Sequence, residues 1–314
     1  MKIGFVTSPV ETFKPEKDTT LALMLEAQAR GYEIYTMDTT DLWFEKGLPW
    51  AAMRKIAINE EVEPWFTVET LLIQPLTECK IILMRKDPPV DMDYYTATYL
   101  LEQAEKQGVC VLNKPASLRD ANEKLFALWF PQCCPPHLIT AKRELILKFV
   151  TEQGDSVIKP LNSMGGQSIF RLRENDDNLL SIIDSLTDHG KHLMMVQKFI
   201  PDIISGGDKR VLMIHGQPIP YALARIPAKG DFRGNLSAGG QGKGAELTAR
   251  DRWICDQVAP VLKEKKLWFV GLDIIGDYLT EINVTSPTCA RELNRLYDIN
   301  IAAQFFDGLS SFVE

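Results

Sequence analysis

The sequence predicts an α/β lobe in the first third of the chain, followed by an α+β region. In the first third, strand-like apolar runs alternate with helical patterns, which is the order of a parallel βαβ sheet layered with helices. The strand-like runs cover 3–7, 33–37, 81–84 and 109–112. The helical patterns cover about 18–30 and 93–107. Further along, short strand-like runs follow one another with glycine-containing turns, which is typical of antiparallel sheets.

Composition limits the kind of protein. With 314 residues and 45% hydrophobic content, the chain can bury a large core and divide into two or three lobes. A net charge of -7 argues against a nucleic-acid binder, which needs a basic face. No apolar stretch reaches the roughly 18 to 20 residues of a membrane span, and the N-terminal run is too short for a signal peptide. Six cysteines without metal spacing are expected to be reduced, in a cytoplasmic protein.

A new lobe is expected to begin near residue 122. Ser117 is a candidate helix N-cap, with a helix continuing to about Phe130. Two sets of antiparallel strands are expected after it. The sets are 156–160 with 167–173, and 193–198 with 209–214 and 217–224. The segment 41–70 shows no clear period and receives no assignment.

The segment 269–285 indicates a metal site. Two apolar strand-like runs flank Gly276-Asp277, a hairpin signal, and Glu281 and Asn283 leave the second run on one face. A three-residue loop over 276–278 is expected to bring Asp273 opposite Glu281. Two carboxylates and an amide oxygen suit Mg²⁺, which is held in nucleotide sites by one or two carboxylates plus phosphates. Alternatively, these residues form the solvated face of an edge hairpin.

Other segments favour a nucleotide site. Lys159 ends a strand before Gly165-Gly166, and glycines let backbone N–H groups approach phosphates closely. Arg210 and Arg225 fall on neighbouring predicted strands, where guanidinium groups suit phosphate and carboxylate oxygens. A long glycine-rich loop follows and is expected to act as a lid. Taken singly, these features also fit an ordinary hairpin turn, surface arginines and a disordered loop.

In combination, the motifs resemble those of the bacterial-type glutathione synthetase family of ATP-grasp ligases. They occur in order along nearly the whole chain. The motifs are Met84-Arg-Lys-Asp-Pro-Pro, Asn113-Lys-Pro-x-Ser-Leu-Arg-Asp, Lys159-Pro-Leu-x-x-Met-Gly-Gly, Gly207-Asp-Lys-Arg-Val-Leu, Leu223-Ala-Arg-Ile-Pro, Arg233-Gly-Asn-Leu and Gly271-Leu-Asp-Ile-Ile-Gly-Asp through Thr280-Glu-Ile-Asn-Val-Thr-Ser-Pro. The second and third lobes would then form an ATP-grasp fold with the nucleotide between them. The implied domains are 1–122, 123–200 and 201–314, with the lid at about 226–242.

The resemblance also implies residue roles. The nucleotide would meet Lys124, Lys159, Met164, Gly165, Gly166, Gln197, Lys198, Phe199, Ile200 and Asp208. The metal ligands would be Asp273, Glu281 and Asn283. Arg210 and Arg225 would bind the transferred phosphate and the developing oxyanion. Candidates for holding the peptide substrate are Arg85, Arg233, Ser286 and Asp18, the last of which could equally be a helix N-cap.

The family's reaction joins γ-glutamylcysteine to glycine, with ATP as co-substrate and Mg²⁺, or alternatively Mn²⁺, as the cofactor. The resemblance implies a homotetramer. Two departures from the family pattern are Asn162, where an acidic residue is expected, and Lys198-Phe199, where Asn-Tyr is usual. The alternatives are a carboxylate-amine ligase with another peptide acceptor, or an ATP-binding regulator without turnover.

Overall fold

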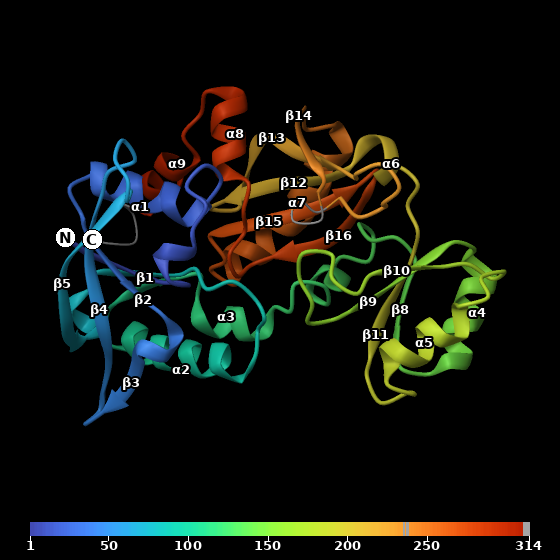
Figure 1. Ribbon diagram of the computed structural model, residues 1–314, viewed down its shortest axis with the longest axis horizontal. Coiled ribbons are helices and arrows are strands. Elements are labelled where there is room, and N and C mark those ends of the chain that lie inside the picture. Colours follow the sequence, from blue (N-terminus) through green and yellow to red (C-terminus); the bar gives the residue numbers. More distant parts are fainter. Residues whose placement is uncertain (235, 237–238, 310–314) are drawn as a thin grey trace.

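The computed structural model describes residues 1–234, 236 and 239–309, whose strands form three sheets (Figure 1). The first sheet has a parallel centre in the order β2-β1-β6-β7, which confirms the predicted α/β lobe. Its parallel strands are β1 (Lys2–Val6), β2 (Glu33–Met37), β6 (Ile81–Met84) and β7 (Cys110–Leu112). Its long helices, also as expected, are α1 (Thr19–Ala29) and α2 (Met92–Lys106).

The unassigned segment 41–70 extends this sheet by antiparallel strands. These strands are β3 (Leu42–Glu45), β4 (Leu48–Ile58) and β5 (Phe66–Pro75), with β4 pairing β2, β3 and β5. Short 3-10 helices cover Val10–Thr12, Thr39–Asp41 and Leu76–Glu78.

The helix expected from Ser117 to Phe130 does not form. A short α3 (Pro115–Asp120) begins earlier, with a proline in its first turn, and Ser117 lies inside it rather than at the cap. The Ser117 hydroxyl donates instead to the Lys265 carbonyl. After α3 the chain lies along β16 (Tyr278–Asn283) and forms only a 3-10 helix, Phe126–Trp129.

The second sheet, in the order β10-β9-β11-β8, has its own small core. Its elements are β8 (His137–Thr140), α4 (Arg143–Gln153), β9 (Ser156–Pro160), β10 (Phe170–Leu172), α5 (Leu179–Thr187) and β11 (Met194–Lys198). The β9–β10 pair confirms the predicted pairing. The expected pairing of 193–198 with 209–214 is wrong, because β11 pairs with β8 and β9. A turn and the one-turn α6 (Ile203–Gly206) separate β11 from the next strand.

The third sheet, in the order β14-β13-β12-β15-β16, is antiparallel. Its elements are β12 (Asp208–Ile214), β13 (Gln217–Ile226), β14 (Gln241–Glu246), α7 (Ala249–Glu264), β15 (Phe269–Ile275), β16, α8 (Ala290–Tyr297) and α9 (Ile301–Leu309). Helices α8 and α9 contact α1 of the first lobe (Figure 1). The predicted lid, about 226–242, includes residues 235, 237 and 238, which lie outside the described residues, as does the chain end from 310.

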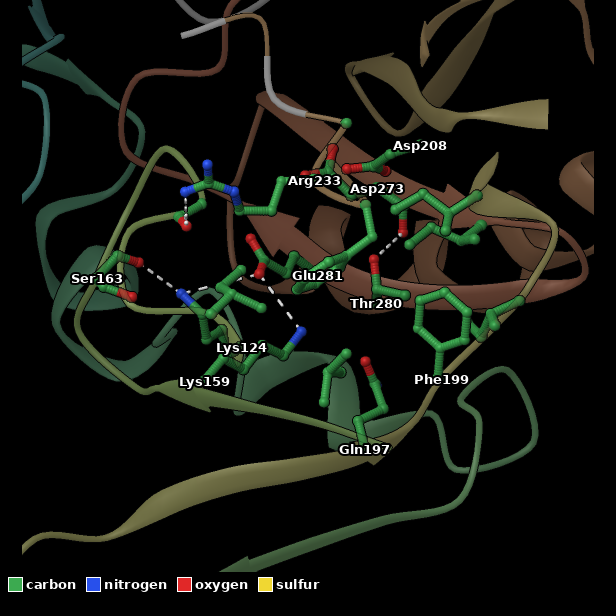
Figure 2. Close-up of a pocket in the computed structure, with 18 of the residues that line it drawn as sticks. Lys124, Lys159, Ser163, Gln197, Phe199, Asp208, Arg233, Asp273, Thr280 and Glu281 are labelled. Carbon is green, nitrogen blue, oxygen red and sulfur yellow. Dashed lines mark hydrogen bonds and ion pairs between the residues drawn. The ribbon is translucent and has the colours of Figure 1, made fainter. Parts of the chain in front are cut away.

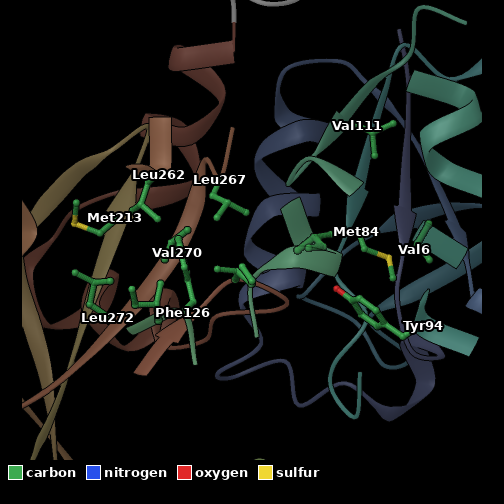
Figure 3. Packing of buried hydrophobic residues seen from close by; sticks show 14 of the residues in the cluster. Val6, Met84, Tyr94, Val111, Phe126, Met213, Leu262, Leu267, Val270 and Leu272 are labelled. Atoms are coloured by element: carbon green, nitrogen blue, oxygen red, sulfur yellow. The ribbon is translucent and has the colours of Figure 1, made fainter. Parts of the chain in front are cut away.

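Buried apolar side chains connect the first and third sheets. One cluster includes Val6, Met84 and Tyr94 from the first lobe together with Phe126 and Leu272 (Figure 3). The second sheet has a separate core. We therefore infer that the first and third lobes form a common base, and that the second sheet is attached to it mainly through its linkers and loops.

Candidate active site

The β15–β16 hairpin carries the three predicted metal ligands. Asp273 is directly opposite Glu281, as the sequence predicted, and Gly271 is opposite Asn283. The connecting loop has two residues, Gly276 and Asp277, so the expected three-residue loop is wrong. A β-bulge next to Asp273 compensates for the shorter loop. It adds one residue to β16, so that the side chains of Asp273 and Glu281 still lie on the same face of the sheet.

Asp273 is enclosed by arginines. Arg210 Nε lies 2.6 Å from Asp273 Oδ1, and Arg225 Nη2 lies 3.0 Å from Asp273 Oδ2. Burial alone raises the pKa of Asp273, but the two arginines hold it well below its usual range. A side chain at Gly271 would place its Cβ 2.8 Å from Arg210 Cδ, so the glycine allows Arg210 to reach the carboxylate.

Arg225 also contacts Asp208. Its Nη2 lies 2.5 Å from Asp208 Oδ2, whereas Asp208 Oδ1 is buried without a hydrogen-bond partner. Burial raises the pKa of Asp208 to about 7, against the opposing effect of Arg225. This free oxygen is available for a ligand hydroxyl.

Glu281 lies between two lysines, as Figure 2 shows. Lys159 Nζ is 3.5 Å and Lys124 Nζ is 3.8 Å from Glu281 Oε1. Burial opposes ionisation of Glu281, but the lysines lower its pKa below the usual value. Lys124 Nζ also donates to the Ser163 carbonyl at 2.6 Å, which holds the glycine loop beside the hairpin.

The donor chemistry at the hairpin fits a hard divalent cation. Asn283 Nδ2 donates to the Gly271 carbonyl at 3.3 Å, which leaves its side-chain oxygen free to coordinate. Asp273, Glu281 and Asn283 all line one cavity. In the part of the chain that the structure describes, no three His, Cys, Asp or Glu side chains form a metal cluster on their own. Three protein ligands would leave coordination positions to phosphate oxygens, as is common for Mg²⁺.

A cleft of about 760 Å³ lies between the second and third sheets. The ten predicted nucleotide contacts all line it. They are Lys124, Lys159, Met164, Gly165, Gly166, Gln197, Lys198, Phe199, Ile200 and Asp208. At one end the Phe199 and Phe232 rings line the cleft, with their centroids 6.2 Å apart in an edge-on arrangement, and the Arg171 guanidinium stacks over Phe199 at 3.9 Å. The other end holds the two lysines, so the cleft suits a base at one end and phosphates at the other.

A second cavity of about 1340 Å³ adjoins the hairpin. It is lined by Ser286 and Asp18, as well as by Arg210 and Arg225. Asp18 caps α1, accepting from Leu21 N at 2.8 Å, so the N-cap alternative holds while the residue also faces the cavity.

The remaining two substrate candidates lie elsewhere. Arg85 is buried and donates to the Pro287 carbonyl at 2.9 Å and to Thr20 at 3.2 Å, joining the first lobe to the loop after β16. Arg233 lines the nucleotide cleft and pairs with Asp231 at 2.7 Å. Neither lines the second cavity.

The comparisons decide the family. The prokaryotic glutathione synthetase ATP-grasp domain matches residues 123–298, and the prokaryotic glutathione synthetase N-terminal domain matches residues 1–119. The chain belongs to the prokaryotic glutathione synthetase family. It is an ATP-grasp ligase of glutathione synthesis.

Curated relatives match the chain over nearly their whole length. The glutathione synthetase of Coxiella burnetii is 52% identical and covers 97% of the chain and 95% of the relative. That of Vibrio cholerae is 52% identical and covers 98% of the chain and 97% of the relative. That of Pseudomonas aeruginosa is 48% identical, covering 99% and 98%.

Solved structures support the fold. The D-cycloserine synthetase DcsG has a TM-score of 0.68 at 13% identity and covers 100% of both chains. The ATP-grasp ligase PsnB, in complex with a minimal precursor, Mg and ADP, has a TM-score of 0.63 at 20% identity, covering 99% and 98%. At such identities the likeness concerns the fold alone. Among the described helices, none has the length and apolar character needed to cross a bilayer.

Sequence reasoning missed a linker that holds this site together. Asn122 Nδ2 donates to Asn162 Oδ1 at 3.2 Å and to the Leu161 carbonyl at 3.3 Å. Asn162 thus accepts a hydrogen bond that an acidic residue could also accept, so this contact is retained despite the departure. Glu123 accepts from Val284 N at 2.9 Å and Thr285 N at 3.1 Å. The family motifs in the sequence do not include Asn122 or Glu123, and no local pattern shows their long-range partners.

Proposed function

We propose that the chain joins γ-glutamylcysteine to glycine through an acyl phosphate formed from ATP. A free carboxylate resists attack by an amine, so its activation by phosphoryl transfer must come first. The substrate carboxylate attacks the γ-phosphorus of ATP, and ADP leaves. The glycine nitrogen then attacks the acyl carbon, and phosphate leaves. No nucleophile from the protein is required, and the protein supplies positioning, positive charge and exclusion of water.

The cleft and the cavity would hold the two halves of this reaction. The nucleotide would lie along the cleft, with its base beside Phe199 and its phosphates between the lysines and the glycine loop. The γ-glutamylcysteine carboxylate would reach the phosphates from the second cavity. Both spaces are lined by Asp273, Glu281 and Met164, so they meet at the hairpin. This shared boundary is the observation that carries the proposal.

Arg210 and Arg225 would stabilise the charge that develops during phosphoryl transfer. Both are buried and both line the second cavity at the hairpin. Guanidinium groups hold phosphate oxygens in a fixed planar geometry, and a low-polarity surrounding strengthens the attraction. Bound Mg²⁺, held by Asp273, Glu281 and Asn283, would neutralise phosphate charge. Mn²⁺ offers the same kind of coordination.

A phosphate-release assay tests the proposal. Purified protein with Mg²⁺ and ATP should release phosphate only when γ-glutamylcysteine and glycine are both present, and mass spectrometry should find glutathione. Release with a different peptide acceptor would identify a related ligase. Magnesium-ATP binding without release under every acceptor would indicate a regulator and contradict the proposal. The oligomeric state, expected to be a homotetramer, is measured by light scattering on the same sample.

A further inference from the structure

Glu123 places an anchored carboxylate on the wall of the second cavity. Its Oε1 accepts three hydrogen bonds, from Val284 N at 2.9 Å, Thr285 N at 3.1 Å and Thr285 Oγ1 at 2.8 Å. Its Oε2 has no hydrogen-bond partner among the described residues, and the side chain lines the cavity. A carboxylate with one fixed oxygen and one open oxygen is oriented to accept a hydrogen bond from a ligand.

The buried cations at the hairpin are committed to other carboxylates. Lys124 and Lys159 lie against Glu281. Arg210 and Arg225 lie against Asp273. Within the described part of the chain, Glu123 forms no ion pair, and burial raises its pKa, with Glu281 adding to the effect. The Glu123 side chain is partly buried, and a partly buried carboxylate without a counter-charge is costly. A bound ammonium group would remove that cost.

Glu123 lies at the end of the cavity that borders the β15–β16 hairpin. Its anchors, Val284 and Thr285, directly follow the proposed metal ligand Asn283 on the same chain segment. The other cavity-lining carboxylates without a metal role come from the first lobe and from α8. They are Asp18, Asp87 and Glu292. Those three are therefore placed to contact the remainder of a peptide, whereas Glu123 borders the hairpin at which phosphoryl transfer is proposed.

We propose that Glu123 binds the ammonium group of the acceptor glycine and holds its nitrogen beside the activated carbonyl. This inference rests on the proposed function. In the ligation, the nitrogen forms a bond to the acyl carbon while the bond from that carbon to the phosphate oxygen breaks, and phosphate leaves with the bonding electrons. Of the two protons lost by the ammonium group, one ends on phosphate and the other in solvent.

Hydroxylamine provides the discriminating nucleophile, because at neutral pH it is mostly uncharged and needs no ammonium-binding carboxylate. It traps an acyl phosphate as a hydroxamate. The Glu123→Gln variant keeps an amide oxygen for the three anchoring donors and removes the negative charge. We expect its kcat/KM for glycine to fall on the order of 100-fold, mainly through KM, since hydrogen bonds to charged groups are strong. Hydroxamate formation from γ-glutamylcysteine and ATP should stay within about threefold of the parent protein.

The control is Asp120→Asn, the same carboxylate-to-amide change three residues away on an exposed side chain that pairs with Lys265. It should leave both reactions unchanged. If Glu123→Gln lowers glycine ligation and hydroxamate formation together, the residue is only a structural anchor and the inference is wrong. Equal glycine kinetics in the variant and the parent would also overturn it. Failure of the parent protein to form either product would instead contradict the proposed function.

Discussion

Arg210 and Asp273 face each other across the paired strands β12 and β15, with Nε 2.6 Å from Oδ1 and Nη2 3.1 Å from Oδ2. This two-point contact joins a proposed phosphate ligand to a proposed metal ligand. Both groups are buried, so each depends on the other for its charge balance. We infer that the pair keeps the site assembled before the nucleotide and metal arrive.

Asp273→Asn should abolish turnover, because it removes a metal ligand and leaves two buried arginines without their shared carboxylate. The loss should exceed about 100-fold in kcat, and the free energy of unfolding should fall by about 3 kcal/mol. Phosphate release and denaturant unfolding measure the two effects. The matched control is Asp251→Asn, which breaks a buried pair with Lys209 on the same sheet, away from the cavities. It should lower stability and retain kcat; retained turnover in Asp273→Asn would refute the metal-site assignment.

Asn283→Ala tests the metal site through the Mg²⁺ concentration that activity requires, rather than through loss of activity. Its free amide oxygen is the weakest of the three proposed ligands, so the variant should still work at high metal. We expect the Mg²⁺ concentration for half-maximal activity to rise by about 10-fold or more. Chelation should stop the parent protein, and Mg²⁺ or Mn²⁺ should restore it. The exposed Asn300→Ala is the control, and an identical metal dependence in both variants would count against coordination by Asn283.

The contact between Asn122 and Asn162 predicts coupling between the linker and the glycine loop. Asn122→Ala should raise the KM for ATP several-fold, because it frees the loop from the linker. Asn162→Ala should do the same, whereas Asn162→Asp keeps an accepting oxygen and should resemble the parent protein. A double-mutant cycle on ATP binding should give a coupling energy of about 1 kcal/mol. Additive effects of the two alanine changes would show that the contact carries no energy.

Periodicity and turn signals predicted the parallel strands and the facing of Asp273 and Glu281, since both depend on local sequence. The bulge in β16 could not be predicted. A three-residue loop without a bulge and a two-residue loop with one inserted residue both place Asp273 opposite Glu281. The partner of β11 was wrong for a related reason. Apolar runs show which segments are extended, but only tertiary packing decides which strand each pairs with and which sheet it joins.

The site residues also divide into those that a local pattern marks and those whose contacts are distant in the sequence. Residues on strands and in the glycine loop were placed correctly around the cleft. Arg85, a candidate for holding the peptide substrate, donates to the Pro287 carbonyl, and an arginine in a family motif looks alike whether it binds a substrate or a carbonyl. Asn113 and Glu123 were passed over, because their partners lie more than 150 residues away. No spacing pattern in a single sequence marks such contacts.

Arg233→Ala should weaken ligation and leave ATP binding within about threefold. Its guanidinium is satisfied by Asp231 and reaches the glycine loop only through a 3.4 Å contact to the Gly166 carbonyl. Loss of this contact should loosen the lid, so phosphate release should exceed glutathione formation. The hydrogen bond from Arg233 lowers the pKa of Asp231 to about 2. The pair therefore stays charged above that pH, and the defect should be constant from about pH 6 to about pH 9.

The control for this lid variant is the exposed Lys229→Ala on the same loop, which should change neither measurement. Nucleotide binding is followed by calorimetry, and the ratio of phosphate to glutathione by parallel assays. A large loss of ATP affinity in Arg233→Ala would contradict the lid role and place the arginine on the nucleotide itself.

Asn113→Asp should destabilise the junction between the first and third lobes. The amide donates to the carbonyls of Phe269 at 2.9 Å and Val284 at 2.8 Å, and accepts from the N–H groups of Trp268 at 2.7 Å and Phe269 at 3.0 Å. The introduced carboxylate could still accept the hydrogen bonds from the two N–H groups, but it would place a negative charge against two carbonyl oxygens. We expect this to lower the free energy of unfolding by about 3 kcal/mol. Because Val284 follows Asn283, the metal requirement should also rise. The same change at exposed Asn59 should cost under about 0.5 kcal/mol. Equal denaturation midpoints for the two variants would show that the four contacts contribute little to stability, and that the hairpin is held by its apolar packing instead.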